Sequence, residues 1–251
     1  MRCYEQLRDG PILHELPVRV IGIGGGFAYG AAGPTHHSLE DYALFRCQPG
    51  ITVLAPADRR QTRSAIEATE AMAGPVYLRI GKGGNPDVPG LDGRFALGRP
   101  EVVREGVDLA FIATGSITPQ AIQAAEALEA AGYSVGAAVV AHLGFRGSPE
   151  LADYLRQFRA VITVEEAFVT GGLGSLVAET IAEHQLDCRL VARGVESTFF
   201  PYVGSAAYLQ EKAGLSVSAL ARAGQTLLED VSASREESPL ATNRLVAGRE
   251  A

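Results

Sequence analysis

The fold of this chain is decided by residues 22–41, which read GIGGGFAYGAAGPTHHSLED. A β-branched run at 18–23 closes on the glycines, and we expect Ser38 to cap a short helix with Asp41 as its acidic partner. A strand that passes through a glycine turn into a helix is typical of α/β proteins. Such glycines can bind a phosphate. The dinucleotide-binding motif G-x-G-x-x-G is incomplete, however, because Tyr29 stands at its third glycine position, and this favours a structural turn over a dinucleotide-binding loop.

Outward from this stretch, strand and helix signals alternate along the chain. Apolar runs predict strands at 51–54, 76–80, 109–113, 134–140, 160–164 and 189–192. Helix starts are predicted at Asp58 with Gln61, at Thr118-Pro119 and at Ser148-Pro149, with further helices at 204–212 and 216–228. The pattern predicts an α/β fold of two parallel-sheet, three-layer domains, the first of them incomplete at its N-terminus.

The domain division follows the composition of the connecting segment. Residues 81–98 are rich in Gly and Pro, so we assign 1–98 to a first domain, 105–230 to a second and 231–251 to a flexible tail. The first domain shows only about three strands, and a parallel sheet that small should be thinly covered and leave an exposed edge. We expect either another chain or a segment before Met1 to complete it.

Composition narrows the class of protein. The chain has 251 residues, and its 22 Lys and Arg against 29 Asp and Glu leave a net charge of −7. A surface that acidic repels phosphate backbones and argues against nucleic-acid binding. Three scattered cysteines suit a reducing compartment, no apolar run reaches the ~18 residues of a membrane helix, and no signal peptide is evident. We therefore expect a cytoplasmic protein without a membrane partner.

Three charged or titratable residues stand where ligands bind in α/β proteins, at the carboxyl ends of strands. His36 and His37 follow the glycine turn and could contact a substrate or move a proton near neutral pH, or could be plain surface residues. Because adjacent side chains point apart, at most one of the two should face a ligand. Arg79 ends the strand at 76–80 and could hold a phosphate or carboxylate, or form a structural ion pair.

Three later motifs have structural interpretations beside functional ones. The glycines at 171–174 could place a helix start near an anion, but close packing is favoured. The pair at 165–166, Glu-Glu, could be an acid pair, although such pairs more often bind loop amides. The aromatic stretch 199–202, FFPY, favours an interface or a core lid over a cofactor site. The remaining histidines are scattered, so we predict no metal ligands in this chain.

At this point the chain resembles a known family. Residues 33–46 (GPTHHSLEDYALFR), 49–58 (PGITVLAPAD) and 74–79 (GPVYLR) look like the pyrimidine-binding domain of transketolases. Residues 161–183 (VITVEEAFVTGGLGSLVAETIAE) are similar to the C-terminal domain of the family. The closer match is the C-terminal subunit of split transketolases, with 1-deoxyxylulose-5-phosphate synthase as a relative. The resemblance covers about residues 2–230.

The resemblance implies thiamine diphosphate chemistry, in which a two-carbon ketol unit passes between sugars or sugar phosphates. The family holds the diphosphate and Mg²⁺ through a GDG motif with a following Asn, and this chain has no such element. An N-terminal partner subunit should therefore carry the diphosphate and metal site. The resemblance also implies an oligomer, either a homodimer or a heterotetramer.

Individual residues carry the family's roles only where the motifs match. By resemblance, His36 contacts the reacting end of the substrate, with His37 beside it, and Arg79 binds the substrate phosphate. Arg2 matches an arginine near the cofactor. Gly24 stands where transketolases have a substrate histidine and the synthase has an arginine.

The chain also departs from the family. Ala31 and Ala32 replace the acidic GED or GAD motif of the family, so a carboxylate that contacts substrate hydroxyls is absent. The glutamate that activates the aminopyrimidine, and an aromatic that packs on it, lie before Met1 in the family. Three alternatives therefore stay open, namely a β-type subunit of a 2-oxoacid dehydrogenase, a non-catalytic paralog or scaffold, and a dinucleotide-binding module.

Overall fold

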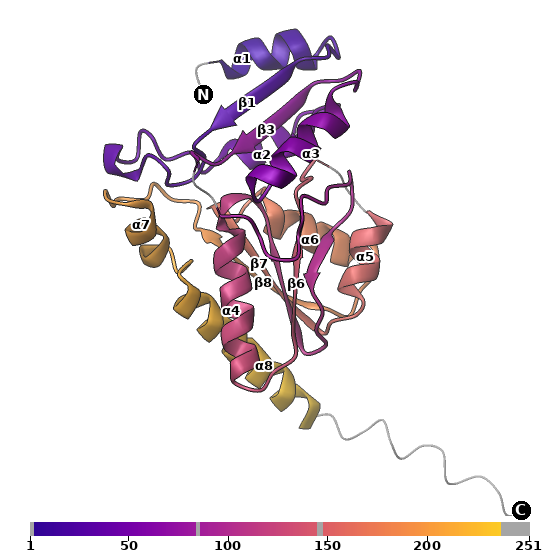
Figure 1. Cartoon of the computed structure of the whole chain (residues 1–251), viewed down its shortest axis with the longest axis vertical. Helices are drawn as coiled ribbons and strands as arrows, with labels where there is room; N and C mark the ends of the chain where they lie inside the picture. The colour runs from indigo at the N-terminus through magenta and orange to yellow at the C-terminus, as the bar shows by residue number, and fades with distance from the viewer. Residues whose placement is uncertain (1–2, 84–85, 145–147, 237–251) are drawn as a thin grey trace, which may run out of the picture.

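Two sheets with helices packed against them make up the part of the chain that the structure describes (Figure 1). The computed structural model describes residues 3–83, 86–144 and 148–236. The first sheet has three strands in the order β1-β3-β2, and the second has five in the order β4-β6-β5-β7-β8. Almost all neighbouring strands are parallel, which confirms the predicted α/β class with two parallel sheets.

The first sheet is built from β1 (Arg19–Ile23), β3 (Val76–Ile80) and β2 (Thr52–Leu54). On one face, the apolar side chains of β2 and β3 pack with Ala65 of α3 (Arg59–Thr69). On the other, Tyr77 stacks on Phe45 of α2 (Asp41–Arg46), with their ring centroids 4.1 Å apart. A short helix α1 (Tyr4–Leu7), continued by a π-helical turn (Arg8–Ile12), packs beside this second face.

The helix starts of this domain match the sequence prediction at α3 and differ at α2. Asp58 caps α3 by accepting the backbone N–H of Gln61 at 2.7 Å, while the Gln61 side chain accepts the N–H of Ala57 at 2.8 Å. The prediction that Ser38 caps α2 is wrong. Ser38 exchanges backbone hydrogen bonds with Gly26 instead, which delays the helix to Asp41.

The second sheet contains four parallel strands, β5 (Leu109–Ala113), β6 (Val135–Val139), β7 (Ala160–Phe168) and β8 (Arg189–Val195). A further strand, β4 (Glu101–Arg104), pairs antiparallel with β6 at the edge. The sequence reasoning placed this segment in the domain boundary. The strand has only four residues, and both of its end residues are charged. Two apolar residues are too few to predict a strand from the sequence.

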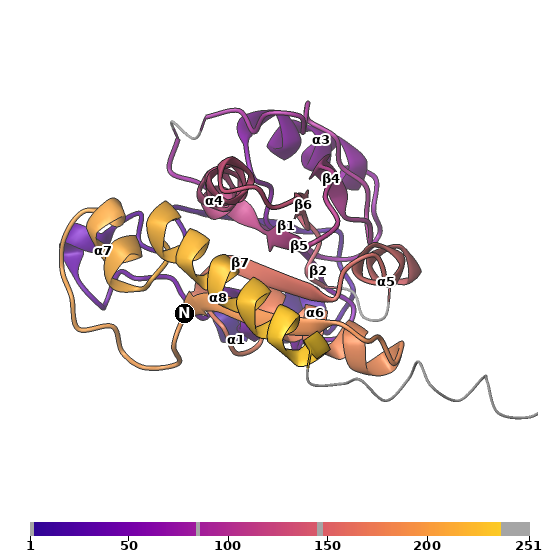
Figure 2. The same cartoon turned by 90° about the horizontal axis from the view of Figure 1, so that it is seen from below.

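Helices cover both faces of the second sheet, as Figure 2 shows. On one face lie α4 (Thr118–Ala130) and α8 (Val217–Glu236), and on the other α5 (Pro149–Leu155) and α6 (Leu173–Glu183). A last helix, α7 (Ala206–Lys212), precedes α8. The prediction of a tail from residue 231 is wrong for 231–236, since Val231 packs on the core and the helix continues. No helix in the described ranges is long and apolar enough to cross a membrane.

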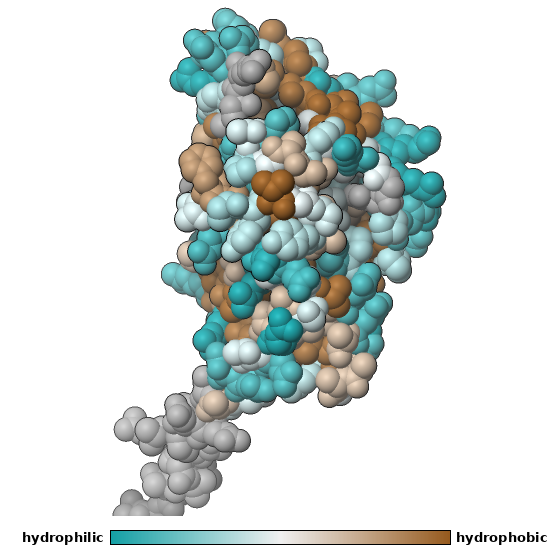
Figure 3. Space-filling view, turned by 90° about the vertical axis from the view of Figure 1, so that its left-hand side faces the viewer, coloured by the Kyte–Doolittle hydropathy of each residue, from teal (hydrophilic) through white to brown (hydrophobic). Residues whose placement is uncertain are grey.

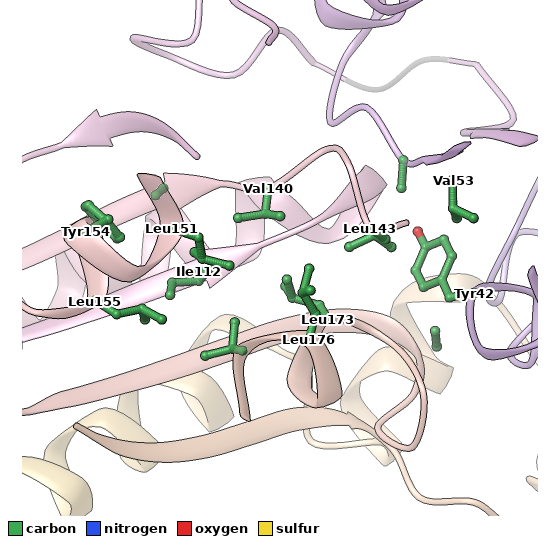
Figure 4. Packing of buried hydrophobic residues seen from close by; sticks show 14 of the residues in the cluster. Tyr42, Val53, Ile112, Val140, Leu143, Leu151, Tyr154, Leu155, Leu173 and Leu176 are labelled. Carbon is green, nitrogen blue, oxygen red and sulfur yellow. The ribbon is translucent and has the colours of Figure 1, made fainter. Parts of the chain in front are cut away.

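The two sheets are joined by backbone hydrogen bonds and a shared core. The Val53 carbonyl accepts the N–H of Leu143 at 2.8 Å, and the Ala55 N–H donates to the Ala141 carbonyl at 2.7 Å. One apolar cluster runs across this joint from Tyr42 to the helices of the second domain (Figure 4). The positions of the two domains are therefore set by packing as well as by the connecting chain.

The outer edge of β1 is the thinly covered part of the molecule. In the described ranges β1 pairs with β3 alone, and Ile21 and Ile23 are 49% and 61% exposed. Figure 3 shows apolar surface at the top of one face, the end at which Figure 1 places α1 and β1. An open strand edge beside exposed isoleucines is a surface that another polypeptide segment can cover.

Candidate functional site

The carboxyl ends of β1 and β3 lie side by side, because the strands are parallel neighbours with Ile23 opposite Ile80. The glycine turn follows β1 at this end and makes room for side chains. A Cβ at Gly25 would overlap the Nε atom of Arg79, so only glycine allows the turn to lie on that guanidinium. The glycines therefore make room for a buried arginine of the same chain, which agrees with the interpretation of this segment as a structural turn.

Arg79 lies at the centre of a buried polar network. Its side chain is 5% exposed, and its Nη1 atom donates to Asp41 Oδ1 at 2.9 Å. Its Nη2 atom donates to the carbonyl of Glu166 at 2.7 Å, and its guanidinium lies 4.3 Å from the Tyr42 ring centroid. Burial opposes the charge on Arg79, but the neighbouring groups Asp41, Tyr42, Glu166 and Tyr77 together outweigh burial and raise the pKa of the guanidinium. This is the geometry of the structural ion pair, and phosphate binding by Arg79 stays a prediction.

The two adjacent histidines have different surroundings. His36 is exposed, and its Nδ1 atom lies 3.0 Å from the Thr35 hydroxyl. His37 is 8% exposed and packs edge-to-face on Phe27, with ring centroids 5.2 Å apart. Neither ring nitrogen of His37 has a hydrogen-bond partner in the described part of the chain. His36 is therefore the more accessible of the two side chains.

A cavity of about 380 Å³ lies beside both histidines. Its walls come from α1, β1, the histidine loop, α2 and β3, and they are mostly apolar or aromatic, with Tyr4, Leu7, Val20, Phe45 and Tyr77 among them. Polar groups reach it from His36, His37, Glu40 and Asp41. An apolar hollow with polar groups at its edge suits a flat heterocycle that carries donors and acceptors.

The presence of glycine at position 24 is explained by its backbone conformation and by the neighbouring ring of Tyr29. The φ of Gly24 is +78°, and a Cβ there would lie 2.5 Å from the ring of Tyr29. The Lys82 ammonium lies 4.0 Å from the centroid of that same ring. Lys82 is exposed where Arg79 is buried, and sequence reasoning missed it. Its position after β3, within the glycines 81–83, was the available signal.

The Glu165 and Glu166 pair binds amides, as the structural interpretation of the pair expected. Glu165 accepts the N–H groups of Leu173 and Gly174, each at 2.8 Å, at the start of α6. Glu166 accepts the N–H of Phe27 at 2.8 Å, which ties β7 to the glycine turn. Burial raises the pKa of Glu165 to about 7, although the two amide hydrogen bonds oppose this shift.

The aromatic stretch after β8 is divided between the core and the surface. Phe200 closes over the histidine loop, with its ring centroid 5.1 Å from that of Phe27. Phe199 is 91% exposed and faces away from the core. Phe200 is thus a lid on the core, and Phe199 offers a free apolar surface.

Three further predictions concern Arg2, the alanines at 31 and 32, and metal ligands. Arg2 lies outside the described residues. Ala31 and Ala32 are exposed in a 3₁₀ turn (Gly30–Ala32). Among the residues that the structure describes, no group of three or more His, Cys, Asp or Glu is arranged to hold a metal ion.

Two family models match the chain in succession. The model "Transketolase, pyrimidine binding domain" matches residues 1–86, and "Transketolase, C-terminal domain" matches residues 98–220. Among curated proteins, the chain is 34% identical over 191 residues to an apulose-4-phosphate transketolase subunit of Phocaeicola vulgatus, covering 76% of this chain and 61% of that protein. It is 36% identical over 218 residues to a 6-deoxy-6-sulfo-D-fructose transketolase subunit of Clostridium sp. strain MSTE9, covering 85% and 66%. The chain thus spans less than two thirds of each relative.

A solved structure agrees with these matches. The structure described as "Split gene transketolase, inactive beta4 tetramer" is similar with a TM-score of 0.80 and 35% identity. The similarity covers 91% of this chain and 72% of that one. Most of this chain therefore has the same fold as the corresponding part of that structure.

Proposed function

The chain belongs to the transketolase family, and from that premise we propose that it is the C-terminal subunit of a split, thiamine-diphosphate-dependent transketolase. The subunit helps transfer a two-carbon ketol unit between sugars or sugar phosphates. One observation supports this proposal most directly. The chain contains both family domains, and in the first of them an accessible His36 lies beside an apolar cavity. The names of the two curated relatives, both transketolase subunits, favour it over a 2-oxoacid dehydrogenase subunit.

We assign residues 1–98 to the pyrimidine-binding domain and 105–230 to the C-terminal domain, close to the ranges that the family models match. An N-terminal partner subunit supplies the diphosphate and Mg²⁺ site, and the assembly is a homodimer or heterotetramer in the cytoplasm. The partner then brings the carboxylate and amide oxygens that Mg²⁺ prefers as ligands.

The cavity beside the histidines fits the cofactor's aminopyrimidine. Its apolar walls match the faces of a flat ring, and the unpartnered nitrogens of buried His37 lie beside it. When bound, thiamine diphosphate supplies the carbanion chemistry that breaks and forms the carbon–carbon bond.

His36 is the chain's own contact with the reacting end of the substrate. Its Nδ1 atom is held by the Thr35 hydroxyl, so Nε2 is the nitrogen available to a substrate oxygen. It can donate a proton to that oxygen or accept one from it. Aromatic packing around His37 and Phe200 keeps water away from the floor of the loop.

The test is reconstitution with the N-terminal partner subunit. We expect thiamine diphosphate with Mg²⁺ to bind tightly only to the mixture, and ketose phosphates rather than 2-oxo acids to be turned over. His36→Asn should lower kcat about 10²- to 10⁴-fold, as loss of a proton-transferring group does. His14→Asn, an exposed histidine elsewhere, is the matched control and should leave kcat unchanged. Tight cofactor binding by this chain alone would refute the shared site.

A further inference from the structure

The segment that follows β8 presents apolar side chains to solvent. Residues 196–203 form neither helix nor strand, and all of them except Phe200 are exposed. Four large apolar or aromatic side chains of this segment and of the neighbouring start of α7 are exposed, and we call them the aromatic face: Phe199, Tyr202, Val203 and Tyr208. Exposed apolar side chains that gather in one place are typical of a surface that another protein covers.

The aromatic face is joined to the loop that carries the histidines. The Gly204 N–H donates to the Gly30 carbonyl at 3.3 Å, and a Cβ at Gly33 would lie 3.4 Å from Cγ2 of Val203. The carbonyl of that same Gly33 accepts the N–H of His36 at 2.9 Å. Figures 1 and 2 both show the orange segment before α7 against the violet loop that follows β1. The aromatic face therefore adjoins the predicted substrate contact.

A hollow of about 260 Å³ lies between the aromatic face and this loop. We call it the aromatic hollow, and most of its walls are apolar: Pro34, Leu39, Phe168, Phe199 and Phe200. His37 and Glu40 complete it, and both of them also line the cavity beside His36. The two cavities are thus neighbours that share a wall.

The size and chemistry of the aromatic hollow suit a single aromatic side chain. Its volume is below the roughly 300–1,000 Å³ of pockets that hold drug-sized ligands. His37 is buried, and neither of its ring nitrogens has a partner in the described part of the chain. A tyrosine hydroxyl or a tryptophan N–H can supply such a partner, and these are the residues that most often anchor protein interfaces.

We propose that the aromatic face is the docking surface for the N-terminal partner subunit, which inserts a tyrosine or tryptophan into the aromatic hollow. The inference rests on the proposed function for the identity of the partner. A subunit that brings the diphosphate site must cover the opening of the cavity beside His36, and the aromatic hollow shares a wall with that cavity. A second copy of this chain docked here would cover the same loop and exclude the partner.

A fluorine probe tests whether the aromatic face becomes buried. The chain has no tryptophan, so Phe199→Trp made with 5-fluorotryptophan carries a single probe. We expect its ¹⁹F resonance to shift when the N-terminal subunit is added, because an exposed ring becomes enclosed. Val107→Trp is the matched control and should not shift. Val107 is also exposed, but it precedes β5, at the end of the second sheet opposite to the segment after β8.

Calorimetry of the complex measures what the aromatic face contributes to affinity. We expect Phe199→Ser to weaken binding of the N-terminal subunit about 30-fold or more, as loss of an aromatic anchor does. Val203→Ser should weaken it about 10-fold, as loss of a smaller apolar contact does. Val107→Ser should leave the affinity unchanged. The three side chains are exposed in the chain alone, so their replacement leaves its core intact.

Two results would overturn the inference. One is a complex that forms with an unshifted resonance at position 199 and equal affinity for Phe199→Ser. The other is a chain that dimerises alone in sedimentation, becomes monomeric as Phe199→Ser and still binds the N-terminal subunit normally, which would assign the face to a second copy.

Failure of the proposed function gives a different pattern. If the complex depends on Phe199 but transfers no ketol unit with cofactor present, the docking surface stands and the function fails. If an active complex forms equally well with Phe199→Ser, the function stands and the docking surface fails. If the N-terminal subunit does not bind the wild-type chain at all, both fail.

Discussion

Arg79 is held by contacts from α2, β7 and the glycine turn, and each contact needs the others. Asp41 neutralises the guanidinium, the Glu166 carbonyl takes another N–H, and Gly25 leaves the space above it. A buried charge without its partner is costly, so the network is stable only when complete. The sequence marked Arg79 and Asp41 separately, but nothing in their spacing showed that they pair.

Loss of the carboxylate should therefore destabilise the fold. Asp41→Asn keeps the shape but leaves Arg79 buried without a counter-ion, and we expect the free energy of unfolding to fall by about 3–5 kcal/mol. Urea denaturation measures it. Asp87→Asn is the control, since Asp87 pairs with Arg59 at the surface and should change stability little. Equal losses in the two variants would show that the Arg79 network contributes no more than a surface pair.

At the scale of elements, α6 begins on a carboxylate from a neighbouring strand. Its N-cap is Gly172, which has no side chain, and Glu165 of β7 binds its first free amides instead. A Cβ at Gly172 would overlap the Glu165 carboxylate, so the glycine is required for this cap. Local capping rules found Asp58 and Ser148, whose side chains cap their own helices, but they cannot find a cap supplied from another element.

This cap should make stability depend on pH. The folded pKa of Glu165 is raised from 4.5 to about 7, so the proton is bound more tightly in the folded state. The resulting stabilisation is complete below pH 4.5 and is lost as the pH rises through 7. The difference in unfolding free energy between wild type and Glu165→Gln should therefore fall from about pH 5 to about 7 and level off above.

Denaturant titrations at a series of pH values measure that difference. Glu67→Gln, which removes an exposed carboxyl on α3, is the control and should follow the wild-type curve at every pH. A wild-type minus Glu165→Gln difference that stays flat across this range would mean that Glu165 does not retain its proton in the folded state.

At the scale of the whole molecule, the two domains share one core. The apolar cluster that includes Tyr42, Val53, Leu143 and Leu173 takes residues from both sheets (Figure 4). The second sheet also includes β4, which lies between the two predicted domain ranges. The domains should therefore unfold together, although their sheets are separate.

A substitution that creates a cavity between the two sheets tests whether the domains unfold together. Leu143→Ala removes a fully buried side chain between the sheets and should cost about 2–5 kcal/mol. Hydrogen exchange should show the amides of β3 and β5 losing protection by the same amount. Leu97→Ala, at a position 41% exposed, is the control and should leave both unchanged. Loss of protection in β5 alone would mean that the domains unfold independently.

The sequence by itself determined the α/β class, nearly all the strands, the caps at Asp58 and Ser148, and the family to which the chain belongs. The class, the strands and the caps follow from local patterns, in which hydrophobic period and turn chemistry act over a few residues, whereas the family follows from the resemblance of whole motifs. The tertiary structure decided that Arg79 is buried while Lys82 is exposed, and that His37 is enclosed while His36 is free. It also placed Gln120, Gln210 and Glu166 in one row. Those outcomes depend on residues far apart in the chain, such as Gln120 and Gln210 at 90 positions and Phe27 and Glu166 at 139, and no local pattern records which of them meet.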